Sequence, residues 1–280
     1  MYCIDTIIRG GQKIYFINEN HDEQRDLVIM FHGFPDTAYG FDKQITQLKK
    51  KYNVIVPFMH GTLNNTDISF KRIHPREIIL DVQALLKKFN PSEKRRVFLV
   101  GHDLGCFTAV GTYEAFPYHI KGLVHINGLG LQQFYSRRFN LSQILKSYYV
   151  FLVQLSLVRF IVTKLFPQFF LNLIYRMSLI DKNNKIYQND NSVFKGIEIY
   201  KHLFRKVFTY IGAPRQKVRV PALFVWGNKD KFLDIPSTDE INQFYDNAQI
   251  RILRGGHWAH HSSGDQFNRI LDNWLGLANE

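Results

Sequence analysis

The 280-residue chain contains only two cysteines, Cys3 and Cys106, which lie far apart in the sequence. Their number and spacing argue against a disulfide framework and against a zinc site. No apolar run reaches the roughly 18 residues that a bilayer-spanning helix needs. The first eleven residues also lack the basic start and apolar core of a signal peptide, so we expect a cytoplasmic protein.

Positive charge, in contrast, is abundant, and the net charge is +12 at pH 7. The basic residues are scattered along the chain, and no nucleic-acid-binding motif accompanies them, so no nucleic-acid partner is expected. We interpret them as solvated faces. Weak attraction to anionic surfaces is the alternative interpretation.

Short apolar runs alternate with amphipathic stretches over most of the chain, which is typical of a mostly parallel sheet covered by helices on both faces. The length and an apolar content of 45% suffice for one large domain with an insertion. The runs predict strands at 4–8, 13–17, 27–31, 54–57, 96–100, 122–126, 222–226 and 249–253, and helices at 41–50, 74–89, 106–116 and 265–277.

The alternation stops between residues 130 and 211, where the sequence is helical in character, apolar and basic at once. We therefore predict an α/β fold in two parts. Residues 1–129 and 212–280 form the core, and residues 130–211 form an inserted helical cap. The oligomeric state stays open.

The segment Gly101-His102-Asp103-Leu104-Gly105 joins a buried strand to a helix. A strand, a turn with flanking glycines and a helix are the context of a nucleophile elbow, in which the central side chain projects from a strained turn. The glycines leave room for the strand and the helix to approach each other. Asp103 is accordingly the candidate nucleophile, although an aspartate after a strand can also be a simple helix cap.

Two further residues follow later strands at the edge where ligands gather in open α/β sheets. Asp230 comes after the strand at 222–226, and His257 stands in a glycine-rich loop after the last strand. The chain order nucleophile, acid, base is that of the α/β-hydrolase triad. The three residues together favour catalysis, because their geometric roles agree.

With these motifs the chain resembles the α/β-hydrolase superfamily, and within it the epoxide hydrolase branch, over nearly its whole length. His32-Gly33-Phe34-Pro35 is similar to the family's His-Gly-x-Pro loop. The resemblance implies a cis bond before Pro35 and an oxyanion hole built from the backbone N–H groups of Phe34 and Leu104. It also implies substrate contacts from His32, Pro35, His102 and Trp258.

Epoxide hydrolases place two cap tyrosines over the nucleophile, and the resemblance assigns these roles to Tyr149 and Tyr200. Tyr149 stands five residues before Gln154, as in the family, and Tyr200 about twenty residues before the proline of the acid strand. Tyr148 is adjacent and could take the place of Tyr149. A cap also needs aromatic residues for packing alone.

Two departures from the family pattern bear on the reaction. Phe58-Met59-His60-Gly61 replaces an acidic-x-Arg-Gly segment, with an effect that the sequence does not define. Haloalkane dehalogenases have the same triad but hold the halide with side-chain N–H groups, which Leu104 and Phe34 do not offer. Dehalogenation is therefore the second hypothesis. The third is a non-catalytic protein that binds ligands, or that binds a partner protein or a membrane surface through its cap.

The expected reaction is the hydrolysis of an apolar epoxide to a vicinal diol. Asp103 would open the ring and become an alkyl ester. Tyr149 and Tyr200 would donate to the epoxide oxygen. Water activated by His257, which Asp230 orients, would then cleave the ester. This scheme needs no metal and no cofactor.

Overall fold

Eight strands form one sheet, with the order β1-β2-β4-β3-β5-β6-β7-β8, in the part of the chain that the structure describes. The structure is a computed structural model that describes residues 2–19, 22–59, 62, 74–137, 139–180, 197, 200 and 217–278. The strands are β1 (Ile4–Arg9), β2 (Gln12–Glu19), β3 (Leu27–Phe31), β4 (Asn53–Pro57), β5 (Val97–His102), β6 (Ile120–Ile126), β7 (Ala222–Gly227) and β8 (Ala248–Leu253).

The sheet is mostly parallel. Strands β1, β2 and β4 pair antiparallel, whereas β4, β3, β5, β6, β7 and β8 pair parallel to one another. Every residue of β3, β4, β5 and β7 is buried, as expected for strands that are covered on both faces. All eight predicted strands are present, with ends that differ by a few residues.

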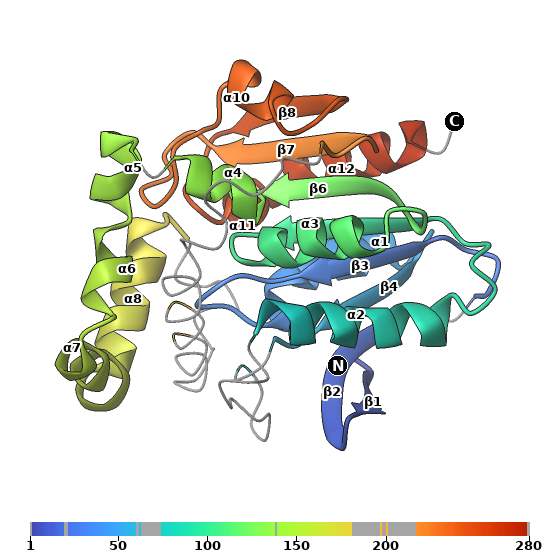
Figure 1. Ribbon diagram of the computed structural model, residues 1–280, viewed down its shortest axis with the longest axis horizontal. Coiled ribbons are helices and arrows are strands. Elements are labelled where there is room, and N and C mark those ends of the chain that lie inside the picture. The colour runs from blue at the N-terminus through green and yellow to red at the C-terminus, as the bar shows by residue number, and fades with distance from the viewer. Residues whose placement is uncertain are drawn as a thin grey trace.

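Helices cover both faces of this sheet (Figure 1). Apolar side chains of α2, α3 and α10 pack on one face, and those of α1, α11 and α12 pack on the other. The helices of the core are α1 (Asp42–Leu48), preceded by a short 3-10 turn (Ala38–Phe41), α2 (Pro75–Phe89), α3 (Gly105–Ala115), α10 (Thr238–Asn242), α11 (Ala259–Ser262) and α12 (Gly264–Leu277).

The turn between β5 and α3 has the strained geometry that the sequence indicates. Asp103 has a φ of 51°, a left-handed conformation that is rare for residues other than glycine. A Cβ atom on Gly101 would lie 2.6 Å from the backbone of Cys106, and one on Gly105 would collide with the backbone carbonyl of Phe31. Both glycines therefore allow α3 to pack directly against the strands, and the nucleophile candidate sits at the tip of the turn.

A second group of helices lies at the end of the sheet toward which the parallel strands point (Figure 1). We refer to α5–α8 as the cap helices, and α4 (Leu131–Ser136) leads into them from β6. The cap helices are α5 (Leu141–Lys146), α6 (Tyr148–Leu152), α7 (Ser156–Phe160) and α8 (Pro167–Met177), with a π-helical turn, η2 (Ile161–Leu165), between the last two.

Side chains of the first cap helix hold it to the core. Lys146 Nζ lies 2.7 Å from an Asp234 carboxylate oxygen and donates to the backbone carbonyl of Asp230 at 3.0 Å. Gln143 donates to the carbonyl of Phe232 at 3.0 Å. These bonds fix α5 against the loop after β7. The cap boundaries at 130 and 211 stay a prediction, because most of residues 181–216 lie outside the described part.

Among the described helices, none is by itself long and apolar enough to cross a bilayer. Ser156–Leu165 and Pro167–Met177 meet that criterion only together, and they are bent by 94° relative to each other.

Candidate active site

Three strand ends bring Asp103, Asp230 and His257 together. They follow β5, β7 and β8, respectively, at the same edge of the sheet. His257 Nδ1 lies 2.9 Å from Asp230 Oδ2, and His257 Nε2 lies 3.5 Å from Asp103 Oδ1. One imidazole therefore contacts both carboxylates, in the order that the sequence predicts for an acid, a base and a nucleophile.

Asp230 is held in place by four hydrogen bonds. Its Oδ1 accepts from the backbone N–H groups of Phe232 at 2.8 Å and Leu233 at 3.1 Å. Its Oδ2 accepts from Asn127 Nδ2 at 2.8 Å as well as from His257. Burial alone would raise the pKa of this carboxyl, but the charge of His257 and the hydrogen bonds outweigh burial and lower it. Asp230 is therefore an anion that orients the imidazole.

The two carboxylates have the opposite effect on His257. Burial of the ring lowers its pKa, but the Asp230 and Asp103 charges and hydrogen bonds raise that pKa to about 10. In the free protein His257 is thus an imidazolium that forms ion pairs with both acids. If Asp103 loses its charge, it no longer raises the pKa of His257, and His257 releases its proton more readily.

The loop after β3 supplies a hydrogen-bond donor to Asp103. The backbone N–H of Phe34 donates to Asp103 Oδ2 at 3.1 Å. The Phe34–Pro35 bond is cis, as the resemblance implies. Tyr175 of α8 donates to the Pro35 carbonyl at 2.9 Å and fixes the loop from the cap side. Leu104, the other oxyanion candidate, is the residue before the first turn of α3, where backbone N–H groups are free of intrahelical partners.

His32 and His102 are fully buried and are not among the described residues that line the cavity beside Asp103. His32 accepts the Met59 N–H on Nε2 at 3.0 Å, so its Nδ1–H donates to the Gly33 carbonyl at 2.9 Å. His102 Nε2–H donates to the His257 carbonyl at 3.1 Å. Burial lowers the pKa of His32 to about 4 and that of His102 to about 3.

Both histidines therefore hold loops rather than face the cavity, and the substrate contacts expected of them have no support in this geometry. Pro35 and Trp258, in contrast, do line the cavity. His60 and Gly61, the departure in the neighbouring loop, lie outside the described residues.

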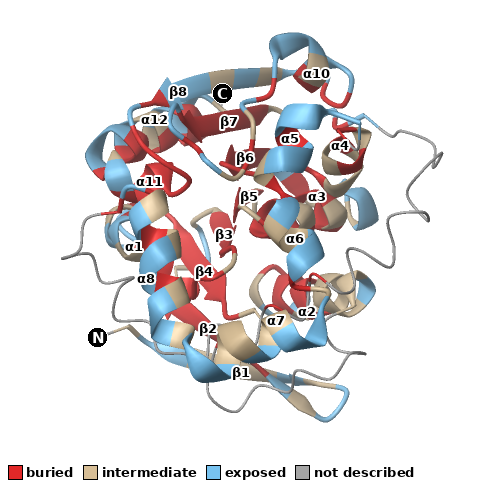
Figure 2. Ribbon diagram, turned by 90° about the vertical axis from the view of Figure 1, so that its left-hand side faces the viewer, coloured by how far each residue is buried: buried red, intermediate tan, exposed pale blue. Residues whose placement is uncertain are grey.

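A cavity of about 550 Å³ opens between the strand ends and the cap helices. Its size falls in the range of small-molecule sites. The described residues that line it include Asp103 and His257 on the floor and apolar side chains of the cap helices opposite. Figure 2 looks onto this end of the molecule, with α6 and α8 in front of the strand ends.

Tyr149 of α6 and Tyr200 both line this cavity. Their rings meet edge to face, with 6.0 Å between the ring centroids. Phe34 packs against the Tyr200 ring, with 5.5 Å between the ring centroids. The two phenols thus stand together over the Asp103 turn.

Removal from water raises the pKa of both phenols, and the negative charge of Asp103 raises each of them further. Tyr149 and Tyr200 are therefore protonated and available as donors at neutral pH. The adjacent Tyr148 also lines the cavity, but 58% of its surface is exposed. The geometry accordingly favours Tyr149 over Tyr148 as the partner of Tyr200.

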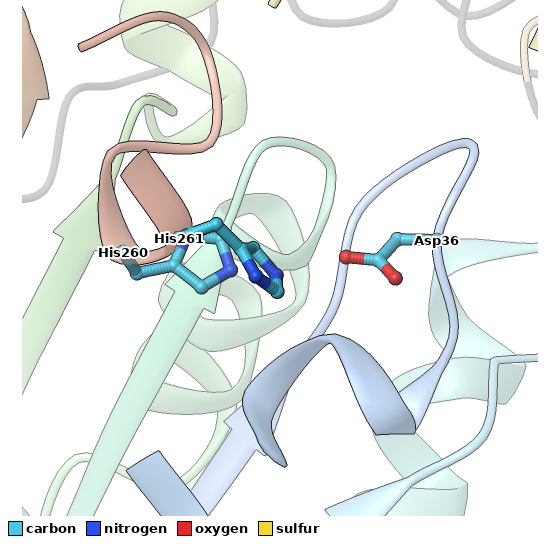
Figure 3. Close-up of side chains that lie close together, drawn as sticks. All are labelled: Asp36, His260 and His261. Carbon is cyan, nitrogen blue, oxygen red and sulfur yellow. The ribbon is translucent and has the colours of Figure 1, made fainter. Parts of the chain in front are cut away.

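A buried polar cluster braces the loops behind the site. A carboxylate oxygen of Asp36 and one ring nitrogen each of His260 and His261 lie within 4.8 Å of one another. The two imidazole rings point from α11 toward the loop after β3 (Figure 3). The Asp36 carboxylate accepts from the Thr37 N–H at 2.7 Å and from Trp258 Nε1 at 3.0 Å. Through these bonds Asp36 ties the loop after β3 to Trp258.

Sequence reasoning missed two residues of the site. Asn127, which has a φ of 43°, donates to Asp230 and also to the Gly256 carbonyl at 3.3 Å. Phe232 packs on the His257 ring at 5.2 Å and lines the cavity. An Asn-Gly pair directly after the buried strand at 122–126 is the signal that could have pointed to Asn127. Nothing in the sequence distinguishes Phe232 from the other 23 phenylalanines.

Comparisons with known proteins agree with the fold and the motifs. Residues 26–263 match the family described as alpha/beta hydrolase fold. Epoxide hydrolase 3 of Xenopus tropicalis is 26% identical over 289 residues, which cover 95% of this chain and 75% of the relative. Human epoxide hydrolase 4 is 22% identical over 304 residues, covering 100% of this chain and 79% of the relative.

A solved structure is similar along its whole length. The crystal structure of the Bacillus megaterium epoxide hydrolase in complex with an inhibitor has a TM-score of 0.78 and 17% identity, and the match covers 97% of this chain and 100% of that one. The resemblance that the motifs indicated is thereby confirmed. The chain belongs to the alpha/beta hydrolase fold family and is a hydrolase, similar to proteins named epoxide hydrolases.

Proposed function

We propose that this hydrolase opens an apolar epoxide to a vicinal diol through a covalent ester on Asp103. The observation that carries the proposal is the pairing of Tyr149 and Tyr200 in the cavity that Asp103 also lines. Two protonated phenols beside a carboxylate match ring opening, in which a carbon is attacked while an oxygen gains charge. The named relatives give independent support for this substrate class.

In the first half-reaction, a carboxylate oxygen of Asp103 attacks one epoxide carbon and the carbon–oxygen bond of the ring breaks. Asp103 Oδ1 is the candidate nucleophile, because Oδ2 accepts the Phe34 N–H. The epoxide oxygen takes a proton from one of the two phenols, and the phenolate left behind is reprotonated as His257 gives up its own proton, which leaves His257 neutral. The product is a neutral ester of Asp103 with a free hydroxyl group on the neighbouring carbon.

In the second half-reaction, His257 takes a proton from a water molecule, which attacks the carbonyl carbon of the Asp103 ester. Negative charge then develops on the oxygen beside the Phe34 and Leu104 N–H groups, which stabilise it. As the ester bond breaks, the departing diol oxygen, which comes from Asp103, takes the proton back from the imidazolium. The new carboxyl group of Asp103, which now holds an oxygen from water, then gives its proton to His257, and the carboxylate and the imidazolium of the free protein are restored. Asp230 stabilises the imidazolium throughout this step.

The same site is poorly suited to release a halide. Phe34 and Leu104 contribute apolar side chains to the cluster around Val153, Ile197 and Tyr200. Neither offers a side-chain N–H group to a halide ion. We therefore rank dehalogenation second and a binding protein without turnover third.

An assay with two substrates distinguishes the three hypotheses: an epoxide hydrolase, a dehalogenase and a binding protein. The protein is incubated with a generic aromatic epoxide and, separately, with a bromoalkane of similar size. We expect diol from the epoxide and no release of bromide. Bromide without diol would favour a dehalogenase, and the absence of both products together with tight lipid binding would favour the binding protein.

The hydrolysis of the ester is expected to depend on pH with a definite sign. His257 must be neutral to act as the base, so the single-turnover rate of ester hydrolysis should rise about tenfold per pH unit below its pKa and then level off. That pKa is about 10 in the free protein. Since esterification removes the Asp103 charge, we expect the plateau to begin at a lower pH.

Rapid-quench kinetics between pH 5 and 10 measures this profile, and the burst of ester formation in the same reactions is the internal control. An ester hydrolysis rate that falls as the pH rises, or that does not change, would contradict the role of His257 as base.

A further inference from the structure

The cap helices expose an unusual amount of apolar surface. Thirteen of the twenty-two large apolar side chains that are exposed in the described residues lie between residues 141 and 173. Leu157 of α7 is 70% exposed, and Phe169 of α8 is 63% exposed. Figure 2 shows much of the outer ribbon of α5–α8 as exposed. Apolar patches of this kind mark interaction sites.

The charge on this part of the chain has one sign. No aspartate or glutamate occurs between residues 115 and 180. The cap helices α5–α8, with the turn η2 between the last two, contain the basic residues Lys146, Arg159, Lys164 and Arg176 and no acidic residue. Lys164 of η2 and Arg176 of α8 lie on the exposed side of these helices. A partner for this surface must therefore accept apolar side chains and carry negative charge.

We propose that the cap helices form a docking surface for an anionic lipid bilayer. Amphipathic helices that combine bulky apolar residues with lysine and arginine bind at the membrane interface in this way. Each basic residue near such a surface adds to the binding, because the lipid head groups carry the opposite charge. The bend of 94° between Ser156–Leu165 and Pro167–Met177 lets both segments lie along the bilayer surface rather than cross it.

The apolar surface is continuous with the mouth of the active-site cavity. Leu145, Tyr148, Leu152 and Leu173 all line the cavity, and each of them is also more than 40% exposed on the outside. Docking through α5–α8 would thus turn the opening toward the lipid. An apolar substrate dissolved in the bilayer would reach Asp103 without crossing water, a consequence that rests on the proposed function.

A second copy of the chain fits this surface less well than a bilayer does. Self-association through the cap helices would bring two positively charged surfaces together, which costs free energy. The described cap helices contain no acidic residue to form ion pairs across such an interface. A dimer is therefore an outcome that the experiment must be able to detect.

The test measures sedimentation of the full chain with vesicles of phosphatidylcholine mixed with phosphatidylglycerol, and with vesicles of phosphatidylcholine alone. We expect binding to the mixed vesicles that weakens as the salt concentration rises. Leu157→Glu combined with Phe169→Glu should weaken it at least about tenfold. Lys164→Ala should weaken binding about fivefold, and only to the anionic vesicles. None of these three residues lines the cavity.

Ile8→Glu is the matched control, because Ile8 is 72% exposed on β1, outside the cap. This variant should bind as the unchanged protein does. The proposal is overturned if the unchanged protein binds neither kind of vesicle, or if Ile8→Glu weakens binding as much as the cap variant. It is also overturned if sedimentation equilibrium reveals a dimer that the cap variant dissociates. Vesicle binding needs no turnover, so its failure and a failure of the proposed reaction are separate results.

Discussion

In the His257→Gln variant, about one equivalent of epoxide is expected to be consumed, after which turnover stops. Ring opening uses Asp103 and the two tyrosines, all of which remain in this variant. Ester hydrolysis needs a base, and glutamine cannot take a proton from water. The loss of general base catalysis should slow the second half-reaction by about 10²–10⁴. Intact-protein mass spectrometry should then show a protein heavier by the mass of one substrate molecule.

Peptide mapping of the trapped protein should place the added mass on Asp103. The variant that combines His257→Gln with Asp103→Ala is the matched control, and it should remain unmodified in the same excess of substrate. An unmodified His257→Gln protein, or an adduct that persists in the control, would contradict the assignment of Asp103 as nucleophile.

The Tyr149→Phe and Tyr200→Phe double variant is expected to lose ring opening almost completely. Each phenol is a donor to the oxygen on which charge develops, and loss of one such donor typically costs about 10²–10³ in rate. Phenylalanine keeps the ring that packs against Phe34 and Phe232, so the cavity should hold its shape. Single-turnover formation of the ester should therefore fall by at least about 10³.

Tyr148→Phe provides the control for this experiment. Tyr148 neighbours Tyr149, with 6.3 Å between the ring centroids, but its side chain lies largely in solvent. Ester formation in this variant should be nearly unchanged. If the double variant retained activity while Tyr148→Phe lost it, the donor role would belong to Tyr148.

The central features of the site could be predicted because they depend on local sequence. The two glycines around Asp103 are required by contacts with Cys106 and Phe31, so the elbow is visible in five residues. The fully buried strands are short apolar runs that end at one edge. That edge fixes where Asp103, Asp230 and His257 meet, and their contacts at 2.9 and 3.5 Å follow from the topology.

Other features depend on packing between distant segments and could not be predicted. His32 and His102 stand beside functional loops, but their rings turn inward to hold backbone carbonyls. Asn127 reaches Asp230 only because β6 lies next to β7 in the sheet. The sequence left open whether the apolar side chains of the cap are buried or exposed, since apolar helices are more often buried than exposed.

The covalent ester on Asp103 is tested most directly by the origin of the oxygen in the diol. A single turnover is carried out in water labelled with heavy oxygen, with protein in excess over epoxide. The first diol released should contain no label, because its new oxygen comes from the carboxylate, and the Asp103 peptide should gain the label instead. A labelled diol together with an unlabelled Asp103 peptide would mean that water attacks the epoxide directly, and it would contradict the covalent mechanism.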